Sequence, residues 1–218
     1  WPGWRLYEPV VRRFAGFGRP LPVPPGFPLA EHRHATCDVL VVGAGPAGLA
    51  AALTLADAGL RIVLADDGAA PGGSLLWEAS EVDGMSGPEW ARAATEKLRA
   101  GDNIELLAST LVTGAYEGNF FTLVQSLADR PAPGAERHWK LRAGQVVLAT
   151  GMIDRPLLFS NNDRPGVMLS GAVRRLVGEF GVAPARRLAV YTSNDSGYLT
   201  AQAAHAAGIE VAAVVDTR

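Results

Sequence analysis

The sequence predicts an α/β protein with a dinucleotide-binding domain on a parallel sheet, a small antiparallel insertion, and an incomplete second domain of nucleotide-binding type. Three observations lead to this fold class. An apolar run over residues 37–42 feeds a GxGxxG turn, a second apolar run ends in an acidic residue, and the strand–helix–strand order restarts at residue 185. The first two observations together make the complete fingerprint of a dinucleotide-binding βαβ unit.

The GxGxxG turn occupies residues 43–48, and each glycine has its own predicted task. Gly43 permits the tight passage from strand to helix because it has no side chain. Gly45 lets the backbone approach a pyrophosphate, whose charge then faces the N-terminal end of the helix that opens near Pro46. Gly48 allows this helix to pack closely on the strand. The turn therefore predicts a bound adenine dinucleotide.

Asp66 ends the second apolar run, 23 residues after Gly43, so its carboxylate is expected to reach the adenosine ribose hydroxyls. Asp67 and Gly68 follow it, and no adjacent Arg or Lys is present to neutralise a 2'-phosphate, which disfavours NADP. FAD and NAD share all of these contacts, so the choice between them stays open. The simpler alternative is a glycine-rich turn in an ordinary α/β core that binds nothing. It is disfavoured because the strand, the helix and the acidic residue follow in the order and spacing of the full fingerprint.

Composition limits the function classes further. The chain has 218 residues, 48% of them hydrophobic, and a formal net charge of −2, which is typical of a globular protein and argues against a nucleic-acid partner. Cys37 is the single cysteine, which excludes an internal disulfide and a CxxC redox pair. We expect it to be a small packing residue immediately before the first strand. The four histidines lack metal-ligand spacing, and we expect neither a metal site nor a catalytic residue.

Residues 39–56 contain no charged side chain, a pattern that also occurs in membrane spans and signal sequences. The glycines and the proline of the turn break this stretch into a buried strand and a helix. We therefore expect a cytoplasmic protein without a membrane segment. The chain starts without Met, so we also expect that it begins inside a longer protein.

Patterning along the chain predicts four regions. Residues 1–35 form a proline-rich docking arm, 36–160 the dinucleotide-binding domain, 161–184 a connector, and 185–218 the start of a truncated second domain. Within the arm, one helix over residues 9–15 and an extended connector over 19–25 are expected. The elements expected after the first βαβ unit are a helix over 88–99, strands over 104–109, 110–116, 120–124, 139–143 and 145–151, then a strand over 186–192, a helix over 196–207 and a strand over 210–216.

The turn of the second domain, residues 192–197, differs from the first. It lacks the glycines that admit a pyrophosphate, and Asp195 is placed to repel one. We therefore expect no NAD(P)H site in this domain.

The order of elements resembles the first nucleotide domain of glutathione-reductase-like flavoproteins. Three stretches, residues 1–13, 149–156 and 161–168, resemble the alpha subunit of heterotetrameric sarcosine oxidase, within a wider group of opine-, proline- and amine-oxidising complexes. The resemblance implies NAD in the first domain, and beta, gamma and delta subunits as partners. It also implies FAD and covalent FMN on the beta subunit, and oxidative demethylation of sarcosine to glycine by the whole complex, with hydrogen peroxide and methylene-tetrahydrofolate formed.

Carried over to this sequence, the resemblance gives a set of cofactor contacts. Val112 is expected to recognise adenine through backbone groups, and Gly151 to close the site. The predicted cofactor-binding residues are Gly43, Gly45, Pro46, Ala47, Gly48, Asp66, Asp67, Gly68, Gly73, Ser74, Val112 and Gly151.

Two other interpretations compete with an oxidase subunit that holds NAD. One is a self-sufficient FAD-dependent NAD(P)H oxidoreductase. Its second domain would need a glycine-rich turn of its own, which residues 193–197 do not supply. The other is a non-enzymatic adaptor that binds nothing, against which the intact Gly43, Gly45, Gly48 and Asp66 argue.

Overall fold

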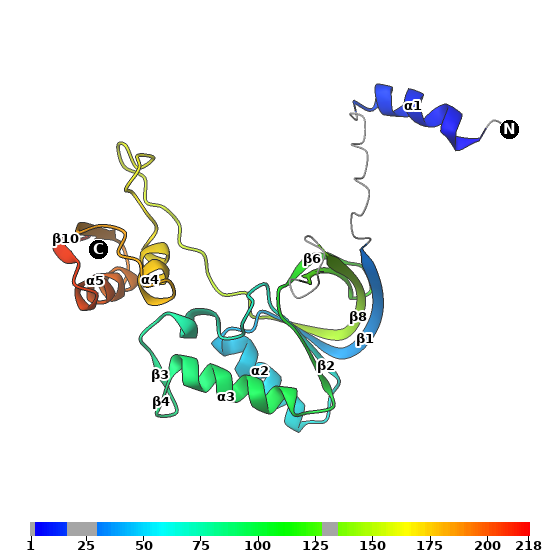
Figure 1. The fold of residues 1–218 in the computed structure, drawn as a ribbon, viewed down its shortest axis with the longest axis horizontal. Coiled ribbons are helices and arrows are strands. Elements are labelled where there is room, and N and C mark those ends of the chain that lie inside the picture. Colours follow the sequence, from blue (N-terminus) through cyan, green and yellow to red (C-terminus); the bar gives the residue numbers. More distant parts are fainter. Residues whose placement is uncertain (1–2, 17–29, 128–134) are drawn as a thin grey trace.

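A computed structural model describes residues 3–16, 30–127 and 135–218 of the chain (Figure 1). Its elements, in chain order, are α1 (Trp4–Phe14), β1 (Glu31–Val42), α2 (Pro46–Asp57), β2 (Ile62–Ala65), the 3₁₀ helix η1 (Gly73–Leu76), β3 (Glu81–Val82), β4 (Met85–Ser86), α3 (Gly87–Arg99), β5 (Ile104–Leu107), β6 (Thr110–Tyr116), β7 (Phe120–Ser126), β8 (Glu136–Leu148), α4 (Ser170–Gly178), β9 (Arg187–Thr192), α5 (Ser196–Ala206) and β10 (Glu210–Asp216).

A six-stranded sheet in the order β5-β2-β1-β8-β7-β6 forms the body of the first domain. Strands β5, β2, β1 and β8 are parallel to one another, and β7 and β6 continue the sheet antiparallel. This confirms the predicted parallel sheet with a small antiparallel insertion. β1 lies in the middle, so its carboxyl end, where the glycine turn begins, sits between β2 and β8.

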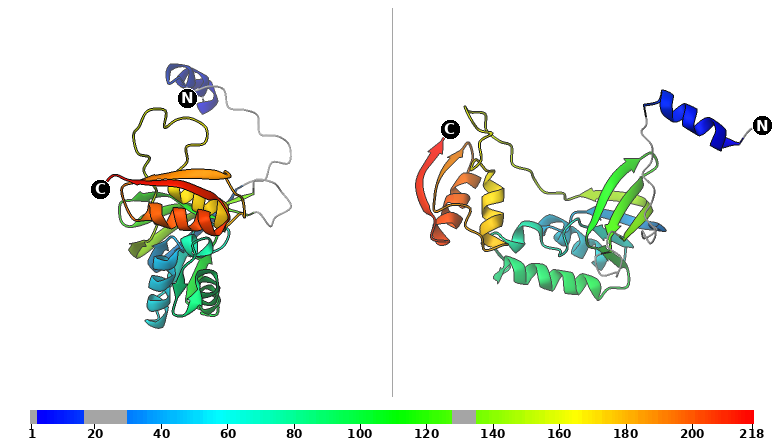
Figure 2. Two further views of the ribbon diagram at one scale, coloured as in Figure 1. Left: turned by 90° about the vertical axis from the view of Figure 1, so that its left-hand side faces the viewer. Right: turned by 45° about the horizontal axis from the view of Figure 1, so that its top comes forward.

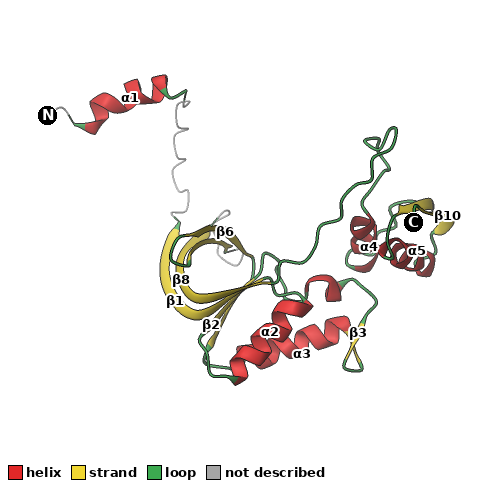
Figure 3. Ribbon diagram, turned by 180° about the vertical axis from the view of Figure 1, so that it is seen from behind, coloured by secondary structure: helices red, strands yellow, loops and turns green. Residues whose placement is uncertain are grey.

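Hydrophobic side chains are buried on both faces of this sheet. On one face α2 and α3 pack together over β1 and β2, with Leu49, Ile62 and Leu98 in the core between them. Figure 3 shows both helices on the same side of the sheet. On the other face Leu123 of β7 and Leu141 of β8 contribute to a second core. Burial on both faces fixes the position of the β1–α2 turn.

The region expected to hold two strands, residues 139–143 and 145–151, is instead the single strand β8 of 13 residues, which ends at Leu148. The prediction of two separate strands was wrong because Gly144 lies within β8 and does not interrupt it. A Cβ at Gly144 would lie 2.8 Å from the backbone oxygen of Asp38, so the glycine permits close approach of two strands. β1 is also long and pairs with β8 on both sides of this point.

Cys37 lies inside β1, and the prediction that it precedes the first strand was wrong, because β1 begins at Glu31. That start is also five residues before the expected start of the domain. Cys37 is buried with 5% of its surface exposed, and this burial raises the pKa of its thiol to about 11. The expectation of a packing residue is confirmed.

At the N-terminal end, α1 begins at Trp4 and not at residue 9 as expected. Its apolar residues Trp4, Tyr7, Val11 and Phe14 follow helical spacing through Pro9, so the amphipathic pattern outweighs the proline. The expected extended connector over residues 19–25 lies outside the described residues, as does Trp1.

Residues 187–216 form a second unit in which β9 and β10 are parallel and α5 packs against both. This confirms the expected strand–helix–strand order. The expected connector contains a helix, α4, which packs on α5. Figure 2 shows α4 and α5 on the same side of the two strands. Among the described helices, none combines the length and hydrophobicity that crossing a membrane requires.

Candidate dinucleotide-binding site

The turn between β1 and α2 depends on two glycines for packing. Gly43 has a φ of +98°, and a Cβ there would lie 2.3 Å from the backbone oxygen of Ala149, which follows β8. A Cβ at Gly48 would lie 1.8 Å from the backbone oxygen of Gly43. Any larger residue at either position therefore forces the helix and strands apart.

Gly45 differs from its two neighbours because the space beside it is open. An added Cβ would meet only the Cα of Gly73, 4.0 Å away. Gly73 in turn has a φ of +54°, and a Cβ there would lie 2.9 Å from the Cα of Gly45. Two glycines thus face each other across a narrow space, which a side chain at position 45 would fill. This is the geometry expected where backbone must approach a phosphate closely.

The N-terminal end of α2 opens on the same space. Gly45 is its N-cap residue, no side chain caps the helix, and its first turn contains no acidic residue. Pro46 has no N–H, whereas Ala47 and Gly48 follow in the first turn, where N–H groups have no intrahelical partner. An uncapped helix end of this kind attracts an anion through its N–H groups and its dipole.

Asp66, directly after β2, is tied to this turn. Its Oδ2 accepts a hydrogen bond of 2.5 Å from the Ala44 N–H, and its Oδ1 accepts one of 2.8 Å from the Gly68 N–H. The backbone of Thr110, at the start of β6, donates to the Asp66 carbonyl oxygen over 2.7 Å. Each carboxylate oxygen keeps further lone pairs, so the fixed side chain retains capacity for two ribose hydroxyls.

Asp67 is exposed beside it, and the sequence did not predict that its charge acts on a basic residue of α4. Arg175 on α4 has a raised pKa, first because Glu179 accepts its hydrogen bond and, to a smaller extent, because of the charge of Asp67. The Arg175 guanidinium is 2.5 Å from Glu179. A cation therefore interacts electrostatically with this loop, but it belongs to a helix more than 100 residues further along the chain and is already paired with Glu179.

The wall opposite the turn is η1, which starts at Gly73. Gly72 donates its N–H to the Ala44 carbonyl oxygen over 2.8 Å, which attaches this loop to the glycine turn. Ser74 is the second residue of η1 and is partly buried. The structure thus brings the Gly72–Ser74 segment to the face of Gly45, as the resemblance implies.

The two remaining predicted residues lie at the edges. Val112 is partly buried in β6 and packs against the second core, two residues after Thr110. Gly151 is exposed with a φ of +75°, two residues after Ala149, which touches Gly43. Val112 is therefore near Thr110, which contacts Asp66, and Gly151 is near Ala149, which contacts the glycine turn. The Val112 side chain itself packs against the core and leaves only its backbone groups for a ligand.

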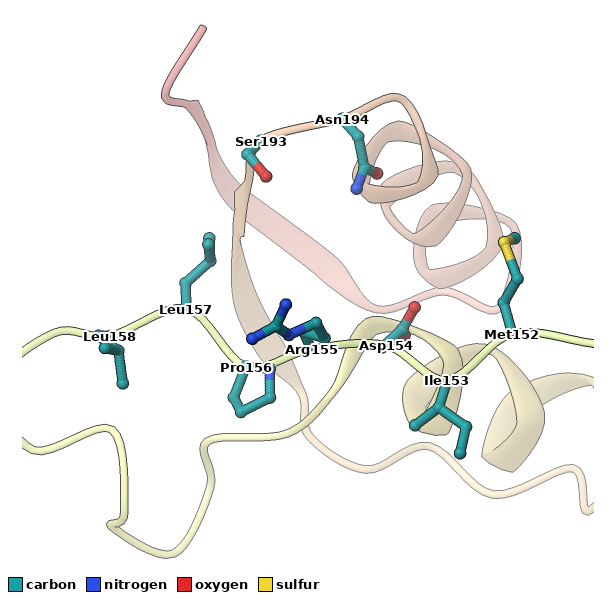
Figure 4. Close-up of a pocket in the computed structure, with 9 residues that line it drawn as sticks. All are labelled: Met152, Ile153, Asp154, Arg155, Pro156, Leu157, Leu158, Ser193 and Asn194. Atoms are coloured by element: carbon teal, nitrogen blue, oxygen red, sulfur yellow. The ribbon is translucent and has the colours of Figure 1, made fainter.

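A pocket of about 640 Å³ lies elsewhere, at the carboxyl end of β9 (Figure 4). It is lined by residues 152–158 together with Ser193 and Asn194. None of the predicted cofactor-binding residues lines it. The features suited to a dinucleotide, which are the glycine backbone geometry and the Asp66 carboxylate, lie at the turn over residues 43–48 and not at this pocket.

Side chains of the protein itself occupy the turn between β9 and α5. Asn194 Oδ1 accepts hydrogen bonds from the backbone N–H and the hydroxyl of Ser196, at 2.9 and 2.7 Å. Asp195 pairs with Arg218 at 2.8 Å, and hydrogen bonds from Arg218 lower the pKa of Asp216 to about 2. The helix end is thereby satisfied from within, which weighs against a second dinucleotide here.

Within the described ranges, no group of three or more metal-ligating side chains comes together. The histidines lie on strands and on α5: His32 and His34 on β1, His138 on β8 and His205 on α5. His32 and His138 face each other across two strands with ring centroids 5.5 Å apart.

Comparison with known proteins gives the family context. Residues 37–217 match the family described as pyridine nucleotide-disulphide oxidoreductase. The whole chain is 45% identical to the alpha subunit of sarcosine oxidase from Rhizobium meliloti (strain 1021), of which it covers 23%. The chain thus spans less than a quarter of this relative. The resemblance inferred from three stretches of sequence is confirmed.

Two further similarities are more distant. The chain is 30% identical to an opine oxidase subunit of Agrobacterium tumefaciens (strain Ach5), over 83% of this chain and 37% of that protein. The crystal structure of L-proline dehydrogenase from P. horikoshii superposes with a TM-score of 0.67 at 28% identity, covering 86% of this chain and 36% of that one. They confirm the predicted fold class and the wider group.

Proposed function

Because the chain belongs to the pyridine nucleotide-disulphide oxidoreductase family, we propose that it is the NAD-holding part of the alpha subunit of a sarcosine oxidase-type complex. One observation carries the proposal. Gly45 and Gly73 face each other before an uncapped helix end, and Asp66 is bonded to the same turn. This arrangement fits a pyrophosphate flanked by a ribose, the central part of any adenine dinucleotide.

Each part of the turn has a role in this proposal. The N–H groups of Ala47 and Gly48 bind pyrophosphate oxygens, and the missing side chain of Gly45 leaves room for them. Asp66 accepts hydrogen bonds from the adenosine ribose, while its own bonds to the turn fix its orientation. The backbone at Val112 is adjacent to the adenine. Ser74 and Gly151 line the other half of the cofactor.

The choice of NAD within this class rests on charge and on the relatives. Asp66 and Asp67 together place negative charge where NADP would carry its 2'-phosphate, so NADP is disfavoured by repulsion. NAD is proposed in place of FAD because the family resemblance described from the sequence implies NAD in this domain, whereas the contacts at the turn are common to both. When bound, NAD can supply hydride chemistry, and in this chain it is held as a structural cofactor.

The family name includes disulphide chemistry, which this chain does not carry within itself. Dithiol–disulfide exchange needs two neighbouring thiols, and Cys37 is the single cysteine. It is also buried in a strand with a raised pKa, which keeps it in the thiol form at neutral pH.

The activity of the whole complex lies beyond this chain, which matches 23% of the sarcosine oxidase subunit. In this proposal the complex demethylates sarcosine oxidatively to glycine, with FAD and FMN on the beta subunit or at its interface. The beta, gamma and delta subunits are the partners. The role of this chain is to hold NAD and to contribute to the assembly.

A second candidate is a subunit of an opine- or other amine-oxidising complex, with FAD in place of NAD. It is favoured by the similarity to an opine oxidase subunit and by the superposition on an L-proline dehydrogenase. The same turn would then hold the adenosine half of FAD, since the contacts are shared.

Acid extraction of the purified complex distinguishes these candidates. Absorbance and mass analysis of the extract identify NAD, FAD or both, and partial separation of subunits assigns each to a chain. NAD released with the alpha subunit supports the first candidate, and FAD from that subunit supports the second. An alpha subunit without any dinucleotide contradicts both.

A further inference from the structure

We propose that Arg174 is a positioning residue for the dinucleotide site, because its ion pair with Glu78 connects the second unit to the η1 wall of that site. The inference rests on the proposed function and names a residue outside the turn that controls it. Neither residue is among the predicted cofactor contacts.

The contact between α4 and the first domain is close and largely buried. Arg174 Nη1 lies 2.7 Å from Glu78 Oε1, with 11% of the Arg174 side chain and 31% of the Glu78 side chain exposed. The Arg174 guanidinium also stacks over the Trp77 ring, 5.6 Å from its centroid. One helical turn later, a Cβ at Gly178 would lie 2.1 Å from the Trp77 carbonyl oxygen, so the helix touches this backbone directly.

From this contact, backbone hydrogen bonds lead to the cofactor site. The N–H groups of Trp77 and Glu78 both donate to the Ser74 carbonyl oxygen, at 3.2 and 2.8 Å. Ser74 follows Gly73, whose Cα faces Gly45 at the predicted pyrophosphate position. A displacement of Glu78 therefore moves the wall opposite Gly45.

The other face of α4 belongs to the second unit. The Ser170 and Thr200 hydroxyls are 2.5 Å apart, and Thr200 is buried on α5 with 3% exposed. The Gly171 N–H donates to Asp154 at 2.5 Å, which anchors the first turn of α4 to the segment after β8. Arg174 thus transmits the position of the second unit to the dinucleotide site through a continuous set of contacts.

The geometry at Arg174 is poorly suited to a purely stabilising role. Its Nε is buried and has no hydrogen-bond partner among the described residues, and an unpaired buried donor costs stability. A hydrophobic contact between α4 and Trp77 would avoid that cost. The charged pair fixes the direction of the contact, because a guanidinium that stacks on Trp77 reaches Glu78 in one orientation.

The test uses the assembled complex that contains the full alpha subunit, with NAD affinity and NAD dissociation rate as readouts. We expect Arg174→Gln and Glu78→Gln each to raise the Kd for NAD about tenfold, mainly through faster dissociation. The double variant should show nearly the same Kd as either single one, because both remove one contact. Arg174→Lys should recover part of the affinity.

Arg187→Gln is the matched control, since it removes an ion pair with Glu210 within the second unit at 3.0 Å and leaves α4 untouched. Its Kd should stay within twofold of the unchanged protein. All titrations are made well below the melting temperature of each variant, so a merely structural role would lower Tm and leave Kd unchanged, which would overturn the inference. If Arg174→Gln does not fold, Glu78→Gln alone decides.

Gly45→Val distinguishes failure of the inference from failure of the proposed function. Should Gly45→Val keep NAD at the original affinity, the site itself is misplaced and both fall. Should Gly45→Val lose NAD while Arg174→Gln and Glu78→Gln bind it normally, only the positioning role is refuted.

Discussion

At the residue scale, three glycines in one turn act in different ways. Gly43 and Gly48 are required because backbone atoms occupy the places where their side chains would be, at 2.3 and 1.8 Å. The space beside Gly45 is open, which leaves room there for the proposed ligand. The sequence pattern predicted the packing tasks of Gly43 and Gly48, which the structure confirms, whereas the ligand-binding task of Gly45 stays a prediction. It did not predict Arg174 or Arg175, because their segment resembles a loop connector and the helix that presents them is defined by packing on α5.

Gly48 and Gly45 should respond differently to the same substitution. Gly48→Val should lower the stability of the fold by about 2 kcal/mol or more, because the helix must move away from the turn. Gly45→Val should change Tm by no more than a degree or two. Thermal unfolding without ligand checks this, and equal destabilisation by both variants would contradict the assignment of tasks.

Asp66→Ala should weaken NAD binding by about 1.5–3 kcal/mol, since a charge-assisted hydrogen-bond pair to the ribose is lost. It should also lower stability without ligand, because the N–H groups of Ala44 and Gly68 lose their acceptor. Calorimetric titration with NAD and NADP provides the measurement. In the unchanged protein NAD should bind more tightly, and equal affinities for the two would show that the acidic pair does not face the ribose.

Cys37 predicts an alkaline dependence of stability. Burial raises the pKa of its thiol to about 11 from an ordinary value of 9.0, so unfolding allows ionisation that the folded state opposes. The contribution is fully present below pH 9 and is lost as the pH rises toward 11. Urea unfolding of the original protein should therefore lose more stability over this range than Cys37→Ala. Parallel curves for the two proteins would contradict this account.

At the scale of elements, the bounds of β1 and β8 depend on long-range strand pairing and could not be predicted from the local sequence pattern. The alternation of residues 139–143 and the apolar run that follows each predicted a strand correctly, but their union into β8 depends on β1 lying beside both. The start of β1 at Glu31 follows from the same pairing, since its exposed first residues contain no apolar run. Helices α3 and α5 carried their own signals and were predicted within one residue, and α2 begins at Pro46, near which a helix was predicted to open.

Gly144 tests this pairing. Gly144→Val should destabilise the first domain by about 1–3 kcal/mol, because its Cβ would lie 2.8 Å from the Asp38 carbonyl oxygen in the neighbouring strand. Ala115→Val, at an exposed position of β6, is the control and should change stability by less than about 0.5 kcal/mol. Chemical denaturation measures both, and a neutral Gly144→Val would mean that the strands are not this close.

At the scale of the molecule, this chain combines one turn suited to a dinucleotide with a second that its own side chains satisfy. The sequence predicted this difference between the two turns, because residues 43–48 carry the GxGxxG pattern whereas residues 192–197 lack it and contain Asp195. The pairing of Asp195 with Arg218 and the contact of α4 with Trp77 could not be predicted, because both join residues far apart in the chain. The asymmetry favours a subunit that holds a cofactor over a self-sufficient reductase.

That distinction predicts the behaviour of the isolated chain. Supplied with FAD and FMN, it should not produce hydrogen peroxide from sarcosine, since the proposal assigns the chemistry to other parts of the complex. A peroxide-coupled assay with the intact complex as positive control checks this. Sustained turnover by the chain alone would favour a self-contained flavoenzyme.

The most direct measurement of the central claim is the cofactor content of a complex that carries Gly45→Val in the alpha subunit. We expect NAD to be lost from this complex while FAD and FMN remain at their original stoichiometry, because the substitution blocks only the turn at which NAD is proposed to bind. Full retention of NAD, or loss of FAD in its place, would contradict the assignment of NAD to the turn between β1 and α2.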